Sequence, residues 1–403
     1  MEQMILQDIC KVYDCPHTTA KDEGIGIPLV RTPNIGKGRL LLTNAHRVNS
    51  DIYQERTRRA IPEEDDIIIA REAPVGNAAI IQMGQKVCLG QRVVLLKPIR
   101  DRVDPNYLVY YLLSDEIQHR LRIHANGAVV AHLNMADIRN LPVSLPSLSE
   151  QKKIGRVLKI IDDKIELNRR INDNLEQQAQ ALFKSWFVDF EPFKDGKFVD
   201  SEMGMIPEGW KVVQLGEIIE ISKRIINPQK NPDKIFYHYS LPACDNGLIP
   251  EIQSGKDIMS NKIILQNNTI LFSKLNPRIK RIWFACDVLN DSICSTEFIP
   301  YRAKNERESV YIYSIINSDS FYASVLGCVN GATGSHQRFH AEDTLGLLFP
   351  YKKDIVDKYI DLVKPVLAEI HKLRIENKTL ALTRDSLLPR LMSGELKFND
   401  LNN

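Results

Sequence analysis

Hydrophobic residues recur at alternating steps of four and three between residues 149 and 190. The series comprises Ile154, Leu158, Ile161, Ile165, Asn168, Asn172, Leu175, Ala179, Leu182 and Trp186. This 3.5-residue period is typical of a helix that buries one narrow stripe against a partner helix. We expect Ser149 to cap this helix and Glu150 to lie at its positive end. At about 1.5 Å per residue the helix would span roughly 55 Å.

A second series with the same period lies near the end of the chain. It comprises Val356, Tyr359, Val363, Val366, Ile370, Leu373, Asn377, Leu380, Arg384, Leu387 and Leu391. The two helices are therefore expected to pair as an antiparallel coiled coil, with Asn172 and Asn377 at core positions that fix its register. The alternative is two amphipathic helices packed separately on two domains.

Pro365 lies inside the second series. Proline lacks the backbone N–H that a helix interior uses, so we expect a kink or break there. The distal helix would then begin near Lys364, after a separate short helix over residues 353–363.

The rest of the chain reads as two mixed regions of strands and helices. Apolar runs of strand length occur at 40–43, 66–70, 78–82 and 93–96, and a helical period follows over 106–121. The second region repeats the first at an offset of 204. DPNYLVYYLLSD at 104–115 aligns without gaps with ESVYIYSIINSD at 308–319, and residues 126–146 align with 330–350.

This repeat predicts an α+β fold in which a mixed domain followed by a long helix is written twice. The expected order is a first domain over 1–146, a central helical spacer over 147–190, a second domain over 191–350 with a leading linker at 191–210, and a distal helical spacer over 351–396.

Composition narrows the class of protein. The 403 residues are 43% hydrophobic and 26% charged, which is typical of a soluble globular protein, and no apolar run is long enough for a membrane span. The seven cysteines form no CxxC motif, so we expect reduced thiols in the cytoplasm and no metal site. The net charge of +2 does not by itself indicate nucleic acid.

Motifs of common enzymes are absent from the sequence. It contains no GxxxxGK[ST] phosphate loop, no GxGxxG before a helix, no HExxH and no [DN]PP[YF] run of amino-methyltransferases. We therefore expect no catalytic residue in this chain.

Three stretches resemble the specificity subunits of Type I restriction-modification systems. They are LPSLSEQKKI at 145–154, IDDKIELNRRIN at 161–172 and AQALFKSWFVDFEPF at 179–193, and LLPRLMSGEL at 387–396 resembles the closing segment of that family. The order of parts also agrees over nearly the whole length.

The resemblance implies a non-catalytic subunit that reads double-stranded DNA. Each mixed domain would be a target-recognition domain for one half of a split target, and the antiparallel helices would set the gap between the halves. Two methyltransferase subunits would dock on the helices, and a motor-nuclease restriction subunit would complete the complex. The cofactors S-adenosylmethionine, ATP and Mg²⁺ would belong to those partners.

With this resemblance, two groups of residues become candidates for DNA contact, because Lys and Arg bind phosphates while Arg, Asn and Gln read base edges. The basic clusters are Arg56, Arg58, Arg59 and Arg71 in the first domain and Lys274, Asn276, Arg278, Lys280 and Arg281 in the second. The glycine-containing loop of the repeat adds His132 and Thr333, Ser335, His336 and Arg338. The alternative interpretations are a solvated surface for the clusters and turn formation for the loop.

Two other functions remain open from the sequence. One is an interaction scaffold in which the coiled coil carries two protein- or ligand-binding heads. The other is a self-contained restriction enzyme, which the missing methyltransferase and nuclease motifs disfavour.

Overall fold

The computed structural model describes residues 2–72, 74–124, 132–328 and 338–396. Its internal contacts divide the chain into two units. The first comprises Met1–Ile165 and Leu380–Asn403, and the second comprises Glu166–Thr379. Each unit thus combines one mixed domain with a part of both long helices, whereas the boundaries predicted between domains and helices remain predictions.

The first unit is built on a mixed sheet of the order β2-β9-β6-β7-β4. These strands are β2 (Cys10–Asp14), β9 (Val93–Pro98), β6 (Ile67–Ala70), β7 (Ala78–Ile80) and β4 (Gly38–Arg39). Among these described strands, only β4 and β7 pair in parallel. A smaller sheet has the order β5 (His46–Val48), β3 (Ile27–Val30), β8 (Cys88–Leu89), and β1 (Glu2–Ile5) pairs with β10 (Pro142–Leu145). Strand β6 is buried at every position, as its run of isoleucines predicts.

Short helices cover the sheet of the first unit. They are α1 (Leu6–Ile9), α2 (Ser50–Arg56), α3 (Pro105–Leu113), α4 (Asp115–His124) and α5 (Met135–Arg139), with a 3₁₀ turn over Thr32–Asn34. Asp104 caps α3 by accepting from the Tyr107 N–H at 2.9 Å, and Pro105 occupies the first turn, where no N–H is needed.

The second unit has the same plan. Its main sheet has the order β14 (Ile219–Ile221), β22 (Phe298–Ala303), β19 (Thr269–Ser273), β20 (Ile282–Ala285). Its second sheet has the order β15 (Ile225–Ile226), β18 (Lys262–Ile264), β21 (Ser292–Ser295), β16 (Ile235–Tyr239), β17 (Glu251–Ser254). Two further pairs are β13 (Lys211–Gln214) with β23 (Leu348–Tyr351) and β11 (Phe198–Val199) with β12 (Ile206–Pro207).

The short helices of the second unit are α7 (Leu215–Ile218), α8 (Leu241–Asp245), α9 (Ser309–Asn317) and α10 (Asp319–Gly327). Further 3₁₀ turns lie at Glu191–Phe193, Pro228–Lys230, Gly255–Asp257, Glu306–Glu308 and Ala341–Thr344.

The two units confirm the repeat seen in the sequence. Helices α3 and α9 lie in the aligned stretches 104–115 and 308–319, and the helices that follow them, α4 and α10, keep the same offset. Each pair follows the last strand of its main sheet. Each unit also holds one parallel pair in its second sheet, β3–β8 in the first and β16–β21 in the second. The predicted α+β fold with two pseudo-repeated domains is correct.

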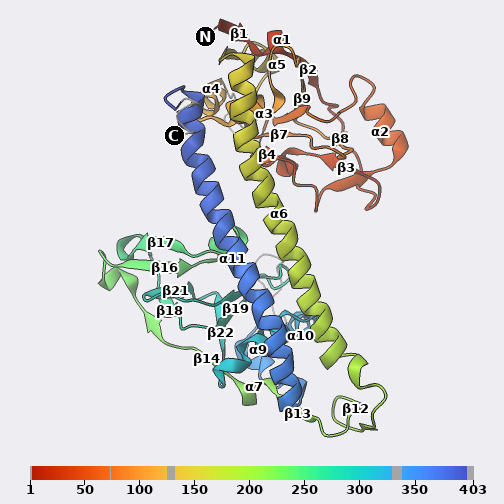
Figure 1. Cartoon of the computed structure of the whole chain (residues 1–403), viewed down its shortest axis with the longest axis vertical. Coiled ribbons are helices and arrows are strands. Elements are labelled where there is room, and N and C mark those ends of the chain that lie inside the picture. The colour runs from red at the N-terminus through yellow and green to blue at the C-terminus, as the bar shows by residue number, and fades with distance from the viewer. Residues whose placement is uncertain (1, 73, 125–131, 329–337, 397–403) are drawn as a thin grey trace. The chain divides into compact units, whose positions relative to one another are not determined.

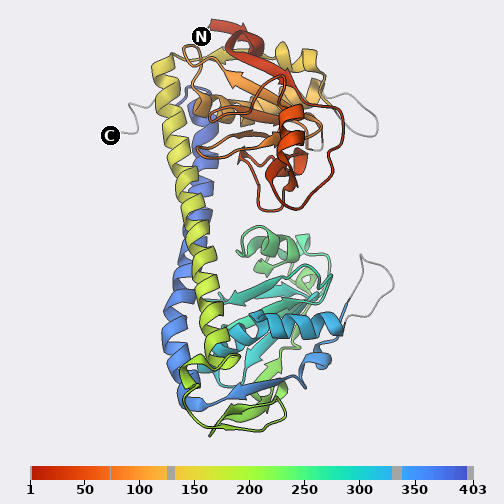
Figure 2. The same cartoon turned by 90° about the vertical axis from the view of Figure 1, so that its right-hand side faces the viewer.

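Two helices of 40 residues each, α6 (Leu148–Phe187) and α11 (Lys353–Met392), lie side by side in each unit (Figures 1 and 2). In the first unit Leu158 shares a core with Leu391. In the second unit the Phe187 ring meets the Tyr359 ring edge-on, with centroids 5.2 Å apart. The start of α6 therefore pairs with the end of α11, and the end of α6 with the start of α11, so the pairing is antiparallel, as predicted. Ser147 rather than Ser149 caps α6, through reciprocal hydrogen bonds with Glu150.

The expected break at Pro365 is wrong, because α11 is continuous through it. Pro365 and Asp361 are both on the exposed face. The Asp361 carbonyl, which loses its helical donor, therefore faces water, while Val363 and Leu367 are buried on the opposite side. Packing of the buried face holds the helix together across the proline.

Asparagines lie at the helix interface of the second unit. Asn168 is fully buried and donates to Asn377 Oδ1 at 3.0 Å and to Glu376 Oε2 at 2.9 Å. The predicted core asparagine Asn172 is also buried, but the partner of Asn377 is Asn168. A role of Asn172 and Asn377 in register stays a prediction.

Among the described helices, none combines the length and the apolar character that crossing a membrane requires.

Candidate DNA interface

The loop over residues 274–281, which joins β19 to β20, is firmly held in the second unit. Ser273 donates its N–H to Arg281 O at 3.0 Å, and Ile279 donates to Asn276 O at 2.9 Å. Asn276 closes the turn in the left-handed region, with φ of 49°, a conformation that asparagine tolerates better than most residues. The Tyr322 hydroxyl donates to Pro277 O at 2.7 Å. This loop is therefore a rigid projection of the sheet.

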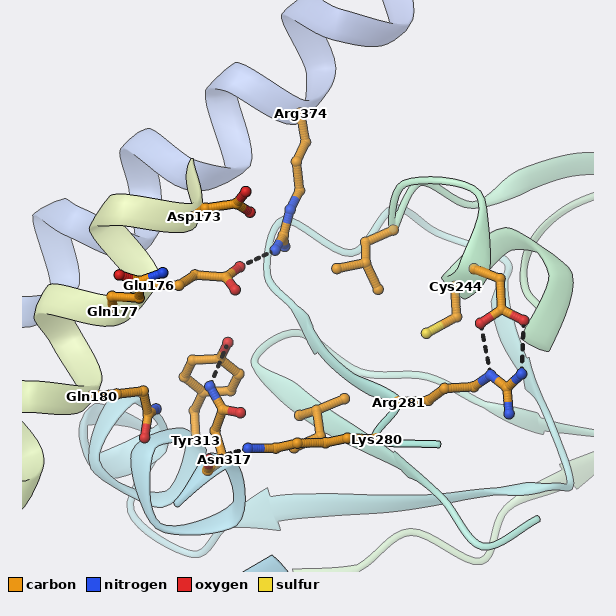
Figure 3. A pocket seen from close by; sticks show the side chains of 13 residues that line it. Asp173, Glu176, Gln177, Gln180, Cys244, Lys280, Arg281, Tyr313, Asn317 and Arg374 are labelled. Carbon is orange, nitrogen blue, oxygen red and sulfur yellow. Dashed lines mark hydrogen bonds and ion pairs between the residues drawn. The ribbon is translucent and has the colours of Figure 1, made fainter. Parts of the chain in front are cut away.

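Two of the predicted basic residues anchor this loop. Arg281 makes a bidentate ion pair with Asp245 of α8, at 2.6 and 2.9 Å, and Lys280 donates to Asn317 O of α9 at 2.6 Å (Figure 3). Both ends of the Arg281 guanidinium fork are committed to this carboxylate, and 16% of its side chain is exposed. DNA contact by Arg281 stays a prediction.

Arg278 and its neighbour Ile279 are the exposed tip of the same loop. Arg278 makes no hydrogen bond or ion pair to any other residue that the structure describes. Lys274 and Asn276 are half-buried beside it. A guanidinium free of internal partners is available for a phosphate or a base edge.

Arg338, from the glycine-containing loop of the repeat, lies next to the basic cluster of the 274–281 loop. Arg338 forms a β-bridge with Leu275 at the start of the loop, and its guanidinium pairs with Glu297 at 3.0 and 3.2 Å. The Glu297 carbonyl also accepts the Lys274 N–H at 2.9 Å. Two candidate segments that are distant in sequence therefore form one surface; Thr333, Ser335 and His336 lie outside the described residues.

The corresponding loop of the first unit, after β6, follows the same plan. His132 forms a β-bridge with Glu72, which is the counterpart of the Leu275–Arg338 bridge. Arg71 turns inward, since it donates to Leu133 O at 2.9 Å and to Asp14 at 3.0 Å. DNA contact by Arg71 stays a prediction, and His132 is half-buried at the edge of the loop.

The three arginines at the end of α2 differ in their contacts: one is buried and hydrogen-bonded within the protein, and two are exposed. Arg56 is 8% exposed and donates to Leu89 O at 2.8 Å and to Thr18 O at 2.9 Å, so it ties α2 to β8. DNA contact by Arg56 stays a prediction. Arg58 and Arg59 are exposed, and neither pairs with another described residue.

A polar cavity of about 520 Å³ lies in the second unit between α6, α11 and the base of the 274–281 loop (Figure 3). Glu176 of α6 pairs with Arg374 of α11 on one side, and Lys280 and Arg281 line the other. Burial raises the pKa of Glu176, against the opposing effect of Arg374. The base of the loop thus adjoins the helix pair directly.

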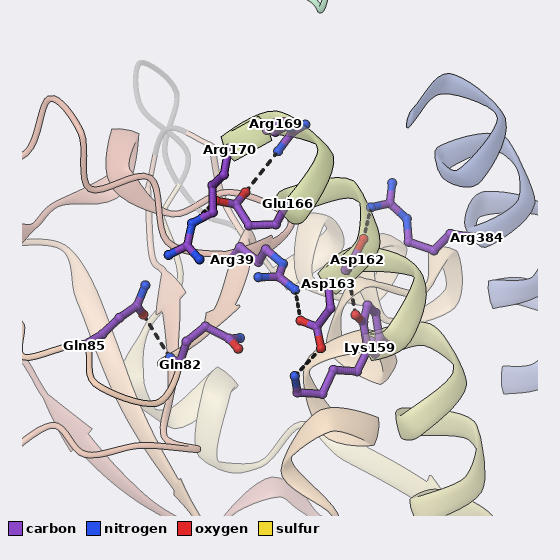
Figure 4. A network of polar contacts seen from close by, with 11 residues as sticks. Arg39, Gln82, Gln85, Lys159, Asp162, Asp163, Glu166, Arg169, Arg170 and Arg384 are labelled. Carbon is purple, nitrogen blue, oxygen red and sulfur yellow. Dashed lines mark hydrogen bonds and ion pairs between the residues drawn. The ribbon is translucent and has the colours of Figure 1, made fainter. Parts of the chain in front are cut away.

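A buried carboxylate links the helices to the first domain. Asp162 of α6 accepts from the Tyr110 hydroxyl of α3 and from Arg384 of α11, both at 2.7 Å (Figure 4). Burial, reinforced by Asp162, raises the pKa of Tyr110, which therefore remains a donor. Asp163 next to it accepts from Arg39 and Lys159. These contacts fix α3 against both long helices.

Sequence reasoning missed the acidic partners of the predicted site. Glu297, Asp245 and Asp14 each neutralise one of the arginines chosen as DNA contacts. No sequence signal marks them, because each lies far along the chain from its partner.

The chain is similar to a known protein family and to several known proteins. Residues 1–177 match the family described as the Type I restriction modification DNA specificity domain. The Type I restriction enzyme MjaVIII specificity subunit of Methanocaldococcus jannaschii is 31% identical over 377 residues, which is 88% of this chain and 84% of that protein. The MjaIX specificity subunit of the same organism is 27% identical, over 88% of this chain and 82% of its own length.

The chain belongs to the specificity subunits of Type I restriction-modification systems. The fold agrees: the S subunit of the Type I system of M. genitalium aligns with 97% of this chain and 95% of its own, with a TM-score of 0.56 at 14% identity. The chain is therefore a DNA specificity subunit, a non-catalytic role in this family.

Proposed function

We propose that this specificity subunit reads a bipartite DNA target, with one half-site for each recognition domain. The observation that carries the proposal is the repetition of one plan, with a bridge at the loop after the equivalent strand, β6 or β19, in each unit. Two equivalent readers in one chain are suited to two half-sites separated by unread base pairs.

In the second domain, Arg278 and Lys274 supply the cationic surface, and in the first domain Arg58 and Arg59 do so. Phosphate contacts from such residues set orientation and most of the non-specific affinity, whereas base-edge contacts set sequence. Asn276 lies two residues before Arg278 on the same loop, and its amide is of the kind that reads base edges, while His132 lies at the bridged loop of the first domain.

The long helices set the gap and carry the docking surface for two methyltransferase subunits. Besides the buried stripe, both helices expose large aliphatic side chains: Leu167, Ile171 and Ile375 in the second unit, and Ile160 and Leu382 in the first. Exposed aliphatic residues on a polar helix surface suit a partner helix. A motor-nuclease restriction subunit would join this assembly. S-adenosylmethionine, ATP and Mg²⁺ serve those partners.

The test is selection of bound duplexes from a random-sequence DNA pool, with the purified chain alone and with a co-expressed methyltransferase subunit. The expected result is a motif of two short specified blocks around a fixed unspecified gap. A single continuous block would refute the bipartite arrangement. No enrichment even with the partner present would refute DNA reading and favour a scaffold that binds proteins or small ligands.

A further inference from the structure

Cys286, Asp287 and His371 bring a thiol, a carboxylate and an imidazole together in the second unit. One donor atom from each side chain lies within 4.8 Å of the other two, and His371 Nε2 is 4.0 Å from Asp287 Oδ2. Cys286 and Asp287 follow β20 in the recognition domain, whereas His371 lies on α11. This cluster is separate from the exposed loop tip at Arg278 and plays no part in the proposed reading surface.

The residues next to the cluster in the chain are well packed. Phe284, two residues before Cys286, stacks on Tyr313 with ring centroids 5.3 Å apart. After the cluster, the Val288 N–H donates to Asn267 Oδ1 at 3.2 Å. His371 follows Ile370, which is 2% exposed in the core. Donor groups on such fixed elements need little reorganisation to bind an ion.

The three side chains line a cavity of about 840 Å³. Its wall carries three cationic side chains. Arg307 pairs with Asp357 and Asp361, Lys372 pairs with Glu369, and Lys364 is exposed to solvent. Asp287 itself is 83% exposed and free to turn. The cavity leaves space for water or another ligand beside the three protein donors.

We propose that Cys286, Asp287 and His371 bind a divalent transition-metal ion, with Zn²⁺ as the fitting ion. Thiolate, imidazole and carboxylate are its usual ligands, at about 2.0–2.3 Å, which places neighbouring donors of a tetrahedral site roughly 3.5 Å apart. Rotation of the exposed Asp287 side chain and a small shift of Cys286 Sγ close the observed spacing. Mg²⁺ and Ca²⁺ do not fit, since they require mainly oxygen ligands.

The bound ion would cross-link the segment after β20 to α11. Strand β20 also carries the base of the 274–281 loop, so the ion would stiffen the attachment of the second recognition domain to its helix. The thiol loses its proton to solvent on binding, and no oxidation or reduction is involved.

Titration of the metal-free full-length chain with Co²⁺ tests the site, because a thiolate ligand gives a charge-transfer band and tetrahedral cobalt gives intense d–d bands. We expect one equivalent to bind with both signatures and Zn²⁺ to displace it. Cys286→Ser should abolish the charge-transfer band. Since even outer-sphere changes cost about 10–100-fold in metal affinity, Asp287→Asn and His371→Asn should each weaken binding by at least about tenfold.

Cys328→Ser is the matched control, because Cys328 is the other thiol that is not fully buried among the described residues. It should leave the band intact. Zn²⁺ should also raise the Tm of the parent chain, and at the same Zn²⁺ concentration it should raise that of Asp287→Asn by less; this exposed change leaves the core untouched. Absence of the charge-transfer band from the parent chain, or its loss in Cys328→Ser alone, would overturn the proposal. These readouts involve no DNA, so they are independent of the proposed function.

Discussion

At the scale of single residues, the arginines of this chain differ in whether the guanidinium group already donates hydrogen bonds to a carboxylate or carbonyl within the protein. Arg56, Arg71 and Arg281 are committed to internal acceptors, whereas Arg278, Arg58 and Arg59 are not. An internally paired guanidinium must break those hydrogen bonds before it contacts DNA, at a cost of about 1.5–3 kcal/mol for each charged bond. Free arginines should therefore dominate binding.

Arg278→Ala is expected to weaken binding to the cognate duplex about tenfold, equivalent to about 1.4 kcal/mol, with an unchanged Tm. Arg281→Ala should instead lower the Tm, because it leaves the loop without its anchor on Asp245. Lys194→Ala, which removes an exposed charge outside both domains' loops, is the control. Fluorescence anisotropy and thermal denaturation on the same preparations measure both effects. Equal affinity of Arg278→Ala and the parent chain would count against this loop as a contact.

His238 predicts a pH dependence of stability. Burial lowers its pKa below the usual 6.5, with Lys262 acting in the same direction and Gln253 and Glu251 opposing. Above about pH 6.5 the ring is neutral in both states. Below it, the unfolded chain binds a proton that the folded chain resists, so stability falls as the pH drops from 6.5 through the folded pKa.

Urea unfolding at about pH 8 and about pH 5.5, compared with His238→Gln, isolates this contribution. The stability difference between the parent chain and the variant should shrink on acidification. His119→Gln, an exposed change, should leave that difference unaltered between the two pH values. A difference that stays constant with pH for His238→Gln would contradict the assignment.

At the scale of elements, the helix period was the most reliable sequence signal. The stripes at 154–186 and 356–391 are buried or half-buried at every position, because a 3.5-residue period sustained over many turns is specific to a helix that buries a narrow stripe. The helical period at 106–121 covered α3 and most of α4, and the aligned stretch 104–115 has α9 at its counterpart 308–319. The DNA surface was harder to predict, since it depends on the acids that each basic residue meets after folding. The Pro365 prediction failed because local propensity was overridden by packing of the opposite helix face.

Gly155 lets α6 approach α3 closely. A Cβ there would lie 2.6 Å from Tyr107 N and 2.7 Å from Asp104 Oδ1. Gly155→Ala is therefore expected to destabilise the chain by about 1–3 kcal/mol, despite the better helix propensity of alanine. Gly327→Ala, where no atom lies within 4 Å, should be neutral or slightly stabilising. Chemical denaturation compares them; a stabilised Gly155→Ala would show that the two helices have room to separate.

Pro365→Ala should stabilise the chain by about 1–3 kcal/mol, because it restores the hydrogen bond to Asp361 O in a helix that is already continuous. The neighbouring exposed change Lys364→Ala serves as reference and should have little effect. The midpoint of urea unfolding reports the gain. No gain from Pro365→Ala would indicate that the helix does not run unbroken through this position.

At the scale of the whole molecule, the duplicated domains predict that each half of the target is controlled separately. In random-sequence selection, Arg278→Ala should relax only one block of the motif, and Arg58→Ala should affect only the other. Each change should also reduce the slope of log affinity against log salt by about one where the residue contacts a phosphate. Simultaneous loss of both blocks from either single change would show that the domains do not read independently.

The last turns of α11 belong to the core of the first unit, where Leu387, Leu388, Leu391, Met392 and Leu396 pack with residues of the first domain. The first domain therefore depends on the last part of the coding sequence. A premature stop codon near position 380 would leave the coding region of the second domain complete. It would nevertheless remove the apolar side chains that the end of α11 contributes to the core of the first domain. Conversely, recombination that replaces only the interior of the second domain would leave both segments of the first unit intact. One internal exchange of sequence should therefore be able to change the specificity of the second domain alone.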